Sequence, residues 1–489
     1  MRPSSASLGP RRPSGTTPDP GAVPSRRQSV RGGVQLSPRA RWPSDSGPNY
    51  VVPDSYLSLP EVEAVPTIQD RNELSRLDSR SIEELASRLR SGDELSHRRD
   101  SLAESRSIQP PGAEAEASAP LSKSLTEFYT ISYLILFALL GTLARLGLQA
   151  LAFFPGTPIL FSCWPNFAGS LVIGFLIEDR MLFCYEWGST STYTRRQQLT
   201  RAKKDEESSS PESEQDLASA KQTHLAVKKT IPLYIGLATG FCGSLTSFSA
   251  FIRDIFLALS NDLPMPDGAP TPRNGGYSFL ALLAIILGTI ALSFSGFYLG
   301  AHLANALEPV TPSLRYPLSS KVIDPLAVVL GWGSWIGAVI LSVVPPDRYS
   351  NPGASELWRG RATFALVFAP LGCLIRFYAS THLNGRFAAF PLGTFAVNVL
   401  GTIVLGLAWD LAHVPEGGVI GCQVFQGIED GFCGCLTTVS TWVVELAVLG
   451  RRKAYVYGGT SVVSALVPMI AIMGGLRWSD GFADLLCVH

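Results

Sequence analysis

The stretch GFCGSLTS at residues 240–247 recurs as GFCGCLTT at residues 431–438, and each copy lies inside a long apolar run. Two glycines and a threonine in the middle of a helix weaken it and predict a break. A break frees backbone carbonyl groups, which a membrane tolerates only where protein, water or an ion satisfies them. The two stretches therefore predict two broken helices buried together inside one membrane bundle.

Two further motifs occur twice in the same order, which indicates an internal repeat. GTLAR at 141–145 matches GCLIR at 372–376, and NFAGSLVIG at 166–174 matches NVLGTIVLG at 398–406. The three motifs are offset by 231, 232 and 191 residues, so the first copy carries 41 extra residues before its break. These extra residues form a polar loop at about 187–229, which we expect to be cytoplasmic and disordered.

Apolar runs long enough to cross a bilayer follow one another through most of the chain. We expect nine spans, at about 127–154, 158–178, 231–258, 277–305, 324–345, 362–380, 388–411, 419–449 and 455–476. Each copy holds four spans and one lies between them, so the second copy enters the membrane from the opposite side. The predicted fold is an all-α polytopic membrane protein with two inverted four-helix repeats, an arrangement found in transporters.

The expected organisation follows from these spans. It comprises a disordered cytoplasmic tail at 1–123, a first repeat at 124–307 with its loop at 179–229, a linker at 308–360 with an inverting helix at 324–345, a second repeat at 361–478, and a C-terminal tail at 479–489.

Charge is distributed unevenly, although the formal net charge is zero. Residues 1–120 hold 16 basic and 16 acidic residues of the 80 in the chain, so the remainder is strongly apolar. No basic excess favours a nucleic-acid partner. Fifteen Lys and Arg fall in alternate loops against five in the others, which predicts a cytoplasmic N-terminus and an extracellular C-terminus.

The eight cysteines lie scattered, mostly in apolar runs, with no C-x-x-C pair. We interpret them as buried small residues rather than as a disulfide framework or a zinc site. The six histidines are isolated and no Walker motif is present, which argues against an enzyme.

Buried polar residues in the repeats leave alternatives open. Asn166 and Asn398 either bridge helices or line a wet path, because an amide in hydrocarbon must be paired. Arg145 and Arg376 either form an anion-attracting vestibule, snorkel to the headgroups, or pair within the bundle. Two helix breaks facing each other would form a cage of carbonyl oxygens suited to a hard monovalent cation.

The sequence GFCGSLTSFSAF at 240–251, together with the duplicated N-x-x-G-[ST]-x-x-x-G, resembles the fluoride channel and exporter family (CrcB/Fluc). The resemblance covers about residues 127–478, and the fused inverted copies resemble its eukaryotic members. It implies passive, selective export of fluoride across the plasma membrane, giving fluoride resistance, by a single fused chain that acts as a pseudo-dimer.

The resemblance also implies roles for individual residues. Asn166 and Asn398 match the pore asparagine, and Phe248 and Phe251 match phenylalanines whose ring edges face the ion. Backbone carbonyls expected to hold a structural sodium ion are those of Gly243, Thr246, Gly434 and Thr437.

A dry fluoride path needs close donors to replace water, such as amides, hydroxyls and the positive edges of aromatic rings. The hydroxyl candidates are Ser249, Thr438 and Ser440.

The second copy departs from the family pattern. Val439 and Trp442 stand where the first copy has its two phenylalanines, whereas the last helix of the second copy shows a polar stripe that includes Tyr457 and Ser461. The first copy has mostly Leu and Ala at 280–287. We therefore expect one working pore, which combines the Phe248 and Phe251 face with the Tyr457 and Ser461 face, and one degenerate pore.

Two rival functions remain. A proton-coupled fluoride antiporter would need a titratable residue beside the path, and acids such as Glu429, Asp430 and Glu445 are expected in the second copy only. A membrane enzyme would need clustered His, Asp, Glu or Cys at depth. We expect the candidate acids to have no counterpart in the first copy, and the histidines are isolated from one another.

Overall fold

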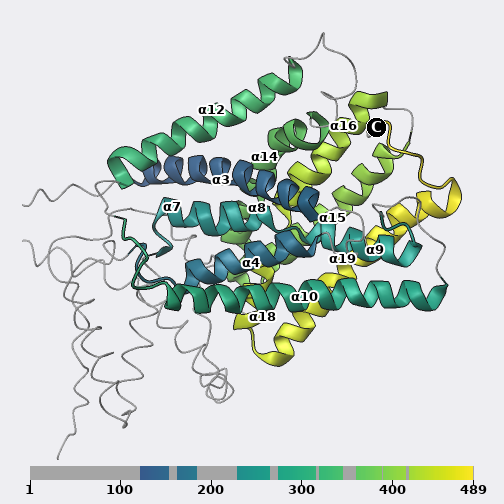
Figure 1. Cartoon of the computed structure of the whole chain (residues 1–489), viewed down its shortest axis with the longest axis horizontal. Helices are drawn as coiled ribbons and strands as arrows, with labels where there is room; N and C mark the ends of the chain where they lie inside the picture. Colours follow the sequence, from purple (N-terminus) through teal and green to yellow (C-terminus); the bar gives the residue numbers. More distant parts are fainter. Residues whose placement is uncertain are drawn as a thin grey trace, which may run out of the picture. The chain divides into compact units, whose positions relative to one another are not determined.

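The computed structural model describes residues 122–152, 162–183, 228–264, 274–314, 319–344, 359–387, 389–414 and 418–487. Most of the tail predicted to be disordered, and most of the loop at 179–229, lie outside the described residues. Every regular element in the described part of the chain is helical (Figure 1).

The first repeat contains four helical regions, the third of which is interrupted. Their bounds are α3 (Lys123–Ala152), α4 (Cys163–Glu178), the series α7 (Pro232–Ile235), η5 (Gly236–Cys242), α8 (Gly243–Leu245) and α9 (Phe248–Ser260), and α10 (Gly275–Ala306).

The second repeat follows the same order after the linking helix. The linker holds η6 (Ser319–Ile323) and α12 (Asp324–Val343), and the repeat holds η7 (Arg359–Phe364), α14 (Ala365–Leu383), η8 (Asn384–Arg386), α15 (Leu392–Ala412), the series α16 (Gly418–Gly427), η10 (Ile428–Cys433), α17 (Gly434–Leu436) and α18 (Ser440–Val448), and α19 (Arg451–Ser479).

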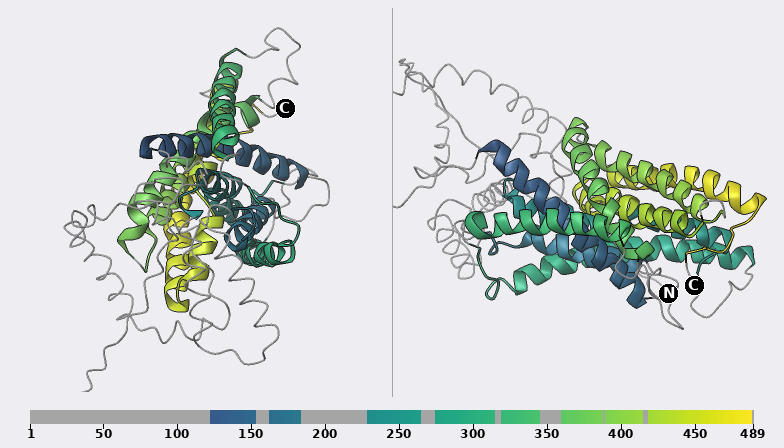
Figure 2. Two further views of the ribbon diagram at one scale, coloured as in Figure 1. Left: turned by 90° about the vertical axis from the view of Figure 1, so that its left-hand side faces the viewer. Right: turned by 90° about the horizontal axis from the view of Figure 1, so that it is seen from above.

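Eight of the described helical regions are long and apolar enough to cross a membrane, and α4 is a shorter apolar helix of 16 residues at the place of the second predicted span. The polytopic all-α fold is thereby confirmed. The two interrupted regions are the most deeply buried, because the other helices surround them. Figure 2 shows α3 crossing its neighbours obliquely, where it packs against α12, α14 and η5.

Equivalent glycines set equivalent close contacts in both repeats. A Cβ atom added to Gly141 would lie 2.7 Å from the carbonyl oxygen of Phe241, and one added to Gly372 would overlap the carbonyl oxygen of Phe432. These contacts bring α3 and α14 against the interrupted helices of their own repeats. The repeated motif therefore corresponds to repeated packing.

The linking helix α12 is bonded to both repeats. The indole nitrogen of Trp332 donates to Ser132 Oγ of α3 at 3.1 Å, and that of Trp335 donates to the carbonyl of Val367 in α14 at 3.0 Å. Near its start, Asp324 is buried and accepts a hydrogen bond from the hydroxyl of Tyr133 at 2.8 Å. These polar contacts fix α12 against the bundle while its other face remains apolar and exposed.

Candidate functional site

The two helix breaks lie where the repeated motif predicts them. Thr246 and Ser247 adopt extended backbone angles between α8 and α9, and Thr437 is extended between α17 and α18. Each break follows a π-helical segment, η5 or η10, which already departs from regular helical bonding. The elements packed around the breaks come from both repeats, since α17 contacts α8 and α9.

The asparagines hold these breaks open. Asn166 Oδ1 accepts the backbone N–H of Ser247 at 2.9 Å, and Asn398 Oδ1 accepts that of Thr438 at 2.9 Å. In a continuous helix these two N–H groups would bond to the carbonyls of Gly243 and Gly434, four residues earlier. Each amide oxygen therefore bridges two helices and withdraws the usual partner from one glycine carbonyl.

The two asparagines differ in their amide nitrogens. Asn398 Nδ2 donates to the carbonyl of Thr438 at 3.2 Å. Asn166 Nδ2 is buried and has no hydrogen-bond partner within the described part of the chain. The hydroxyl groups four residues later differ in the same way. Thr402 donates to the carbonyl of Asn398 at 2.7 Å, whereas Ser170 Oγ lacks a partner among the described residues.

Hydroxyl groups join the two breaks across the repeats. Thr246 Oγ1 accepts the backbone N–H groups of Val439 and Ser440 at 3.2 and 3.1 Å, where α18 begins. Reciprocally, Thr437 Oγ1 accepts the N–H of Ser249, near the start of α9, at 3.1 Å. Each repeat therefore caps a half-helix of the other, and the positive N-terminal ends of two half-helices meet at the centre.

The hydroxyl candidates from the sequence all lie in this centre and are fully buried. Ser249 Oγ is 3.0 Å from Thr437 Oγ1, and the hydroxyls of Thr438 and Ser440 are each 3.1 Å from Thr246 Oγ1. The structure thus brings these three residues together with both break threonines.

Arg145 and Arg376 also lie inside the bundle, each 1% exposed. Arg376 donates from Nε to the carbonyl of Cys435 and from Nη2 to that of Thr239, both at 2.8 Å. Arg145 Nη2 donates to the carbonyl of Asp430 in the opposite repeat. Both arginines therefore pair with backbone carbonyls within the bundle, and the vestibule role stays a prediction.

The arginines explain one glycine in each motif. A Cβ atom at Gly243 would overlap the guanidinium of Arg376, and one at Gly434 would overlap that of Arg145. Each guanidinium therefore lies directly on the backbone of a break and satisfies carbonyls that the irregular helices expose.

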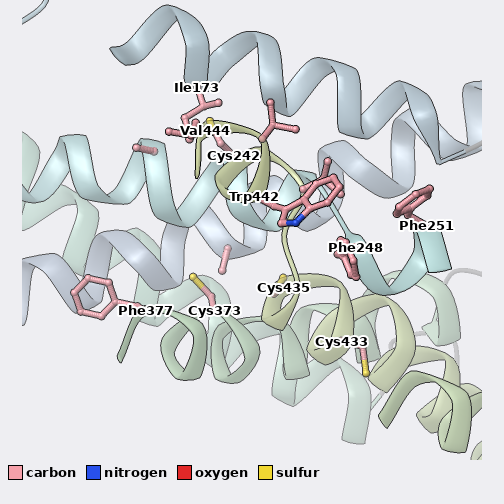
Figure 3. Packing of buried hydrophobic residues seen from close by; sticks show 14 of the residues in the cluster. Ile173, Cys242, Phe248, Phe251, Cys373, Phe377, Cys433, Cys435, Trp442 and Val444 are labelled. Atoms are coloured by element: carbon pink, nitrogen blue, oxygen red, sulfur yellow. The ribbon is translucent and has the colours of Figure 1, made fainter. Parts of the chain in front are cut away.

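Three aromatic rings surround the junction of α9 and α18, shown in Figure 3. Phe248 and Phe251 of α9 are 5.8 Å apart between ring centroids, at a steep angle. Phe248 also meets the indole of Trp442 from α18 at 5.4 Å, with an interplanar angle of 68°. The cross-repeat aromatic contact therefore uses the tryptophan that replaces a phenylalanine.

The polar stripe of the last helix is buried and hydrogen-bonded. Tyr457 donates its hydroxyl to Glu445 Oε2 at 2.6 Å, and Ser461 donates to the carbonyl of Tyr457 at 2.7 Å. Most of the buried positions of α19 recur every four residues, and so do those in the middle of α10. On α10 this stripe includes Thr289 and Ser293, which lie beyond the 280–287 segment considered from the sequence.

Comparison with known proteins assigns the family. The family model described as CrcB-like protein, Camphor Resistance (CrcB), matches residues 132–301 and 363–476, one segment in each repeat. The chain belongs to the CrcB-like family. No solved structure matches this chain.

Named relatives of this CrcB-like chain come from fungi and bacteria. Fluoride export protein 1 of Neurospora crassa is 54% identical over 468 residues, which cover 90% of this chain and 85% of the relative. Fluoride export protein 1 of Candida albicans is 32% identical, covering 74% and 83%. The fluoride-specific ion channel FluC of Geotalea uraniireducens is 40% identical over 83 residues, covering 17% and 65%.

The CrcB-like repeats also share an acidic position, which corrects one expectation. Glu445 was expected in the second copy only, yet the 191-residue offset places Asp254 at the equivalent position. Ser162 donates to Asp254, and Thr394 donates to Glu445 at 2.5 Å. The acid and its hydroxyl donor are therefore duplicated, and the same offset would have found them.

Glu429 and Asp430 do belong to the second copy alone, since Ala238 and Thr239 stand at the equivalent places. Arg253 lies beside this acidic pair, 3.9 Å from Glu429 and 3.1 Å from Asp254, and its guanidinium lies over the ring of Trp409.

A disulfide between Cys422 of α16 and Cys487 corrects the interpretation of the cysteines. The sequence could not reveal it because the two cysteines are 65 residues apart and one lies within an apolar helix. Five other cysteines of the described residues are buried and not disulfide-bonded: Cys163, Cys242, Cys373, Cys433 and Cys435. Cys184 lies outside the described residues.

The disulfide ties the C-terminal segment to α16, and further contacts hold the same segment against the end of α15. Phe482 packs against Trp409 and His413, and the backbone N–H of Ala483 donates to the carbonyl of His413 at 3.3 Å. Burial lowers the pKa of His413 below its ordinary value of 6.5, and nearby Arg253 acts in the same direction. The neutral ring, which donates from Nδ1 to the carbonyl of Trp409, suits this packing.

Proposed function

We propose that this chain exports fluoride from the cytoplasm by passive, selective conduction. The names of its relatives in Neurospora crassa and Candida albicans support the ion and the direction, and that of the Geotalea relative supports a channel. The observation that carries the proposal is the pair of helix breaks, which gathers amide, hydroxyl and aromatic donors in a buried centre between two half-helix N-termini. Such donors can replace the water around a small anion.

The proposed path joins elements of both repeats. Helix α9, which carries Phe248 and Phe251, packs against α15 and α19, which carry Asn398, Tyr457 and Ser461. We assign these faces to the working pore, while Asn166 belongs to the equivalent route that α4 and α10 form. An inside-negative potential drives an anion outward with about 2.3 kcal/mol per 100 mV.

A structural sodium ion is part of the proposal. The carbonyls assigned to it are those of Gly243, Thr246, Gly434 and Thr437, and the asparagines withdraw the usual helical partners from the two glycine carbonyls. Oxygen donors freed in this way suit a hard cation. Sodium would supply fixed positive charge that ties the two breaks together. We therefore expect sodium to raise the unfolding temperature of the protein more than potassium does at the same concentration.

The proposed location is the plasma membrane, with the N-terminus in the cytoplasm and the C-terminus outside. Disulfides persist in oxidising extracellular surroundings, which supports an external position for Cys422 and Cys487. A membrane-impermeant reductant added to intact cells should reduce this disulfide. Resistance in intact cells, with reduction after permeabilisation, would reverse the orientation.

Proton-coupled antiport is the second candidate, because one observation favours it. The carboxylate of Glu445 is buried and accepts the hydroxyl of Tyr457, a residue of the proposed path. A titratable group in contact with the path is what a coupled mechanism requires.

Fluoride efflux from liposomes tests both candidates. Purified protein is reconstituted with internal fluoride, a potassium gradient and valinomycin, and external fluoride and pH are recorded together. A channel predicts efflux that follows the imposed voltage without stoichiometric proton uptake, with chloride retained. Efflux that ignores voltage and moves protons in fixed ratio supports the antiporter, and chloride efflux at the fluoride rate contradicts both.

A further inference from the structure

Trp442 is among the largest fully buried side chains of the described residues, and its indole nitrogen is unsatisfied. The side chain is 1% exposed, and Nε1 has no hydrogen-bond partner in the described ranges. Trp332 and Trp335, by contrast, both donate their indole N–H to protein oxygens. A buried indole N–H normally finds a partner, and a buried donor left unpaired destabilises the fold unless a ligand satisfies it.

The position of Trp442 places this free donor beside the proposed path. Its ring meets Phe248 of the opposite repeat at 5.4 Å, as Figure 3 shows. A Cβ atom added to Gly458 of α19 would lie 3.6 Å from Cζ2 of the indole, one residue from Tyr457. The indole therefore contacts Phe248, on one face assigned to the working pore, and lies beside α19, the helix that carries the other face.

The equivalent place in the other route is built differently. The 191-residue offset relates Trp442 to Phe251, and it relates Phe248 to Val439. Trp442 therefore meets the aromatic ring of Phe248 across the repeats. At the equivalent place in the other route, Phe251 has the aliphatic Val439 as the counterpart of that ring. A complete cross-repeat aromatic pair is formed only at Trp442 among these four positions.

We propose that Trp442 is a fluoride-contacting residue whose indole N–H donates a hydrogen bond to the ion as it passes Phe248. This inference rests on the proposed function. An N–H donor to an ion makes a charge-assisted bond, about twice as strong as a neutral one and stronger than contact with a C–H ring edge. The tryptophan thus replaces a weak donor by a strong one and helps to select the small anion.

The flux experiment removes the donor while keeping an aromatic ring. Trp442→Phe should lower fluoride efflux about tenfold and reduce the preference for fluoride over chloride. Trp409→Phe is the matched control, because Trp409 Nε1 also lacks a partner in the described part of the chain. Its ring lies near the C-terminal end of α15 and is partly exposed. This control should stay within about twofold of the parent protein.

An NMR measurement on the indole N–H of Trp442 distinguishes direct contact with fluoride from a role in packing alone. With 15N-labelled tryptophan in nanodiscs, the Trp442 indole signal, assigned by its absence in Trp442→Phe or Trp442→Tyr, should move downfield with sodium fluoride. Sodium chloride at equal concentration should leave it in place.

Two results would overturn the inference. One is a Trp442 signal that is indifferent to fluoride, and the other is an unaltered fluoride preference in Trp442→Phe while the parent protein conducts. A parent protein that fails to move fluoride contradicts the proposed function instead, so the two failures are distinguishable.

Discussion

The two breaks at the centre share a backbone and differ in the side chains around it. Both use the same glycine, threonine and asparagine positions, and both receive a buried arginine. Around them, Asn166 Nδ2 has no partner among the described residues while Asn398 uses both its polar atoms, and Phe251 is matched by Trp442. Groups that support the broken backbone are retained in pairs, whereas the aromatic groups assigned to the proposed path differ between the repeats.

The largest expected effect separates the two arginines. Arg376 makes two hydrogen bonds to carbonyls of the interrupted helices and Arg145 makes one, so Arg376→Ala should lower the free energy of unfolding by about 3–6 kcal/mol and Arg145→Ala by about half as much. Thermal unfolding followed by size-exclusion chromatography in detergent measures the difference.

Arg376→Lys is the matched control, because it keeps the charge but cannot hold two carbonyls in fixed directions. It should fall between the parent protein and Arg376→Ala. Equal losses for both alanine variants would show that the two breaks are energetically equivalent.

The disulfide should give the next largest effect, and it has no counterpart in the first repeat, since Ile231 stands at the place equivalent to Cys422. Cys487→Ser opens a loop of about 65 residues and should cost about 2–4 kcal/mol. Thermal unfolding with and without a reductant measures it. The variant should be insensitive to reductant, and a parent protein that is equally insensitive would contradict the assignment.

The asparagines should then separate stability from transport. Asn398→Ala removes two backbone hydrogen bonds and should cost about 1–3 kcal/mol, more than Asn166→Ala, which removes one. Asn166→Asp keeps the oxygen that holds Ser247 but replaces the free amide with negative charge. If the route past Asn166 carries part of the flux, liposome efflux should fall without a matching loss of stability. We expect unchanged efflux in Asn166→Asp, because the route past Asn166 is the one expected to be degenerate.

The smallest effect concerns His413, which has no histidine equivalent in the first repeat. Its pKa is lowered in the folded protein, so the unfolded chain binds more protons below about pH 6.5, and stability falls as the pH drops through that range. Unfolding temperatures at pH 7.5 and 5.5 should therefore differ less in His413→Gln than in the parent protein. A larger pH dependence in the variant would reverse the assigned sign.

The sequence predicted the parts of the fold that depend on local pattern. Apolar length located the spans, and the motif GFCG located both breaks, because glycine and threonine weaken a helix wherever they stand. It could not predict that Arg145 reaches Asp430 in the other repeat, since that contact depends on how two distant helices cross. The disulfide of Cys487 was missed for the same reason, whereas Asp254 was overlooked although the offset pointed to it.

The linking helix α12, bonded through Trp332 to one repeat and through Trp335 to the other, has an evolutionary consequence. In an assembly of two identical chains every substitution appears twice, so a change that benefits one half is imposed on both. A covalent join removes that constraint and lets each half accept mutations alone. Trp442 and Val439 differ from Phe251 and Phe248 at the equivalent places of the first repeat, and two identical chains could not differ from each other in this way.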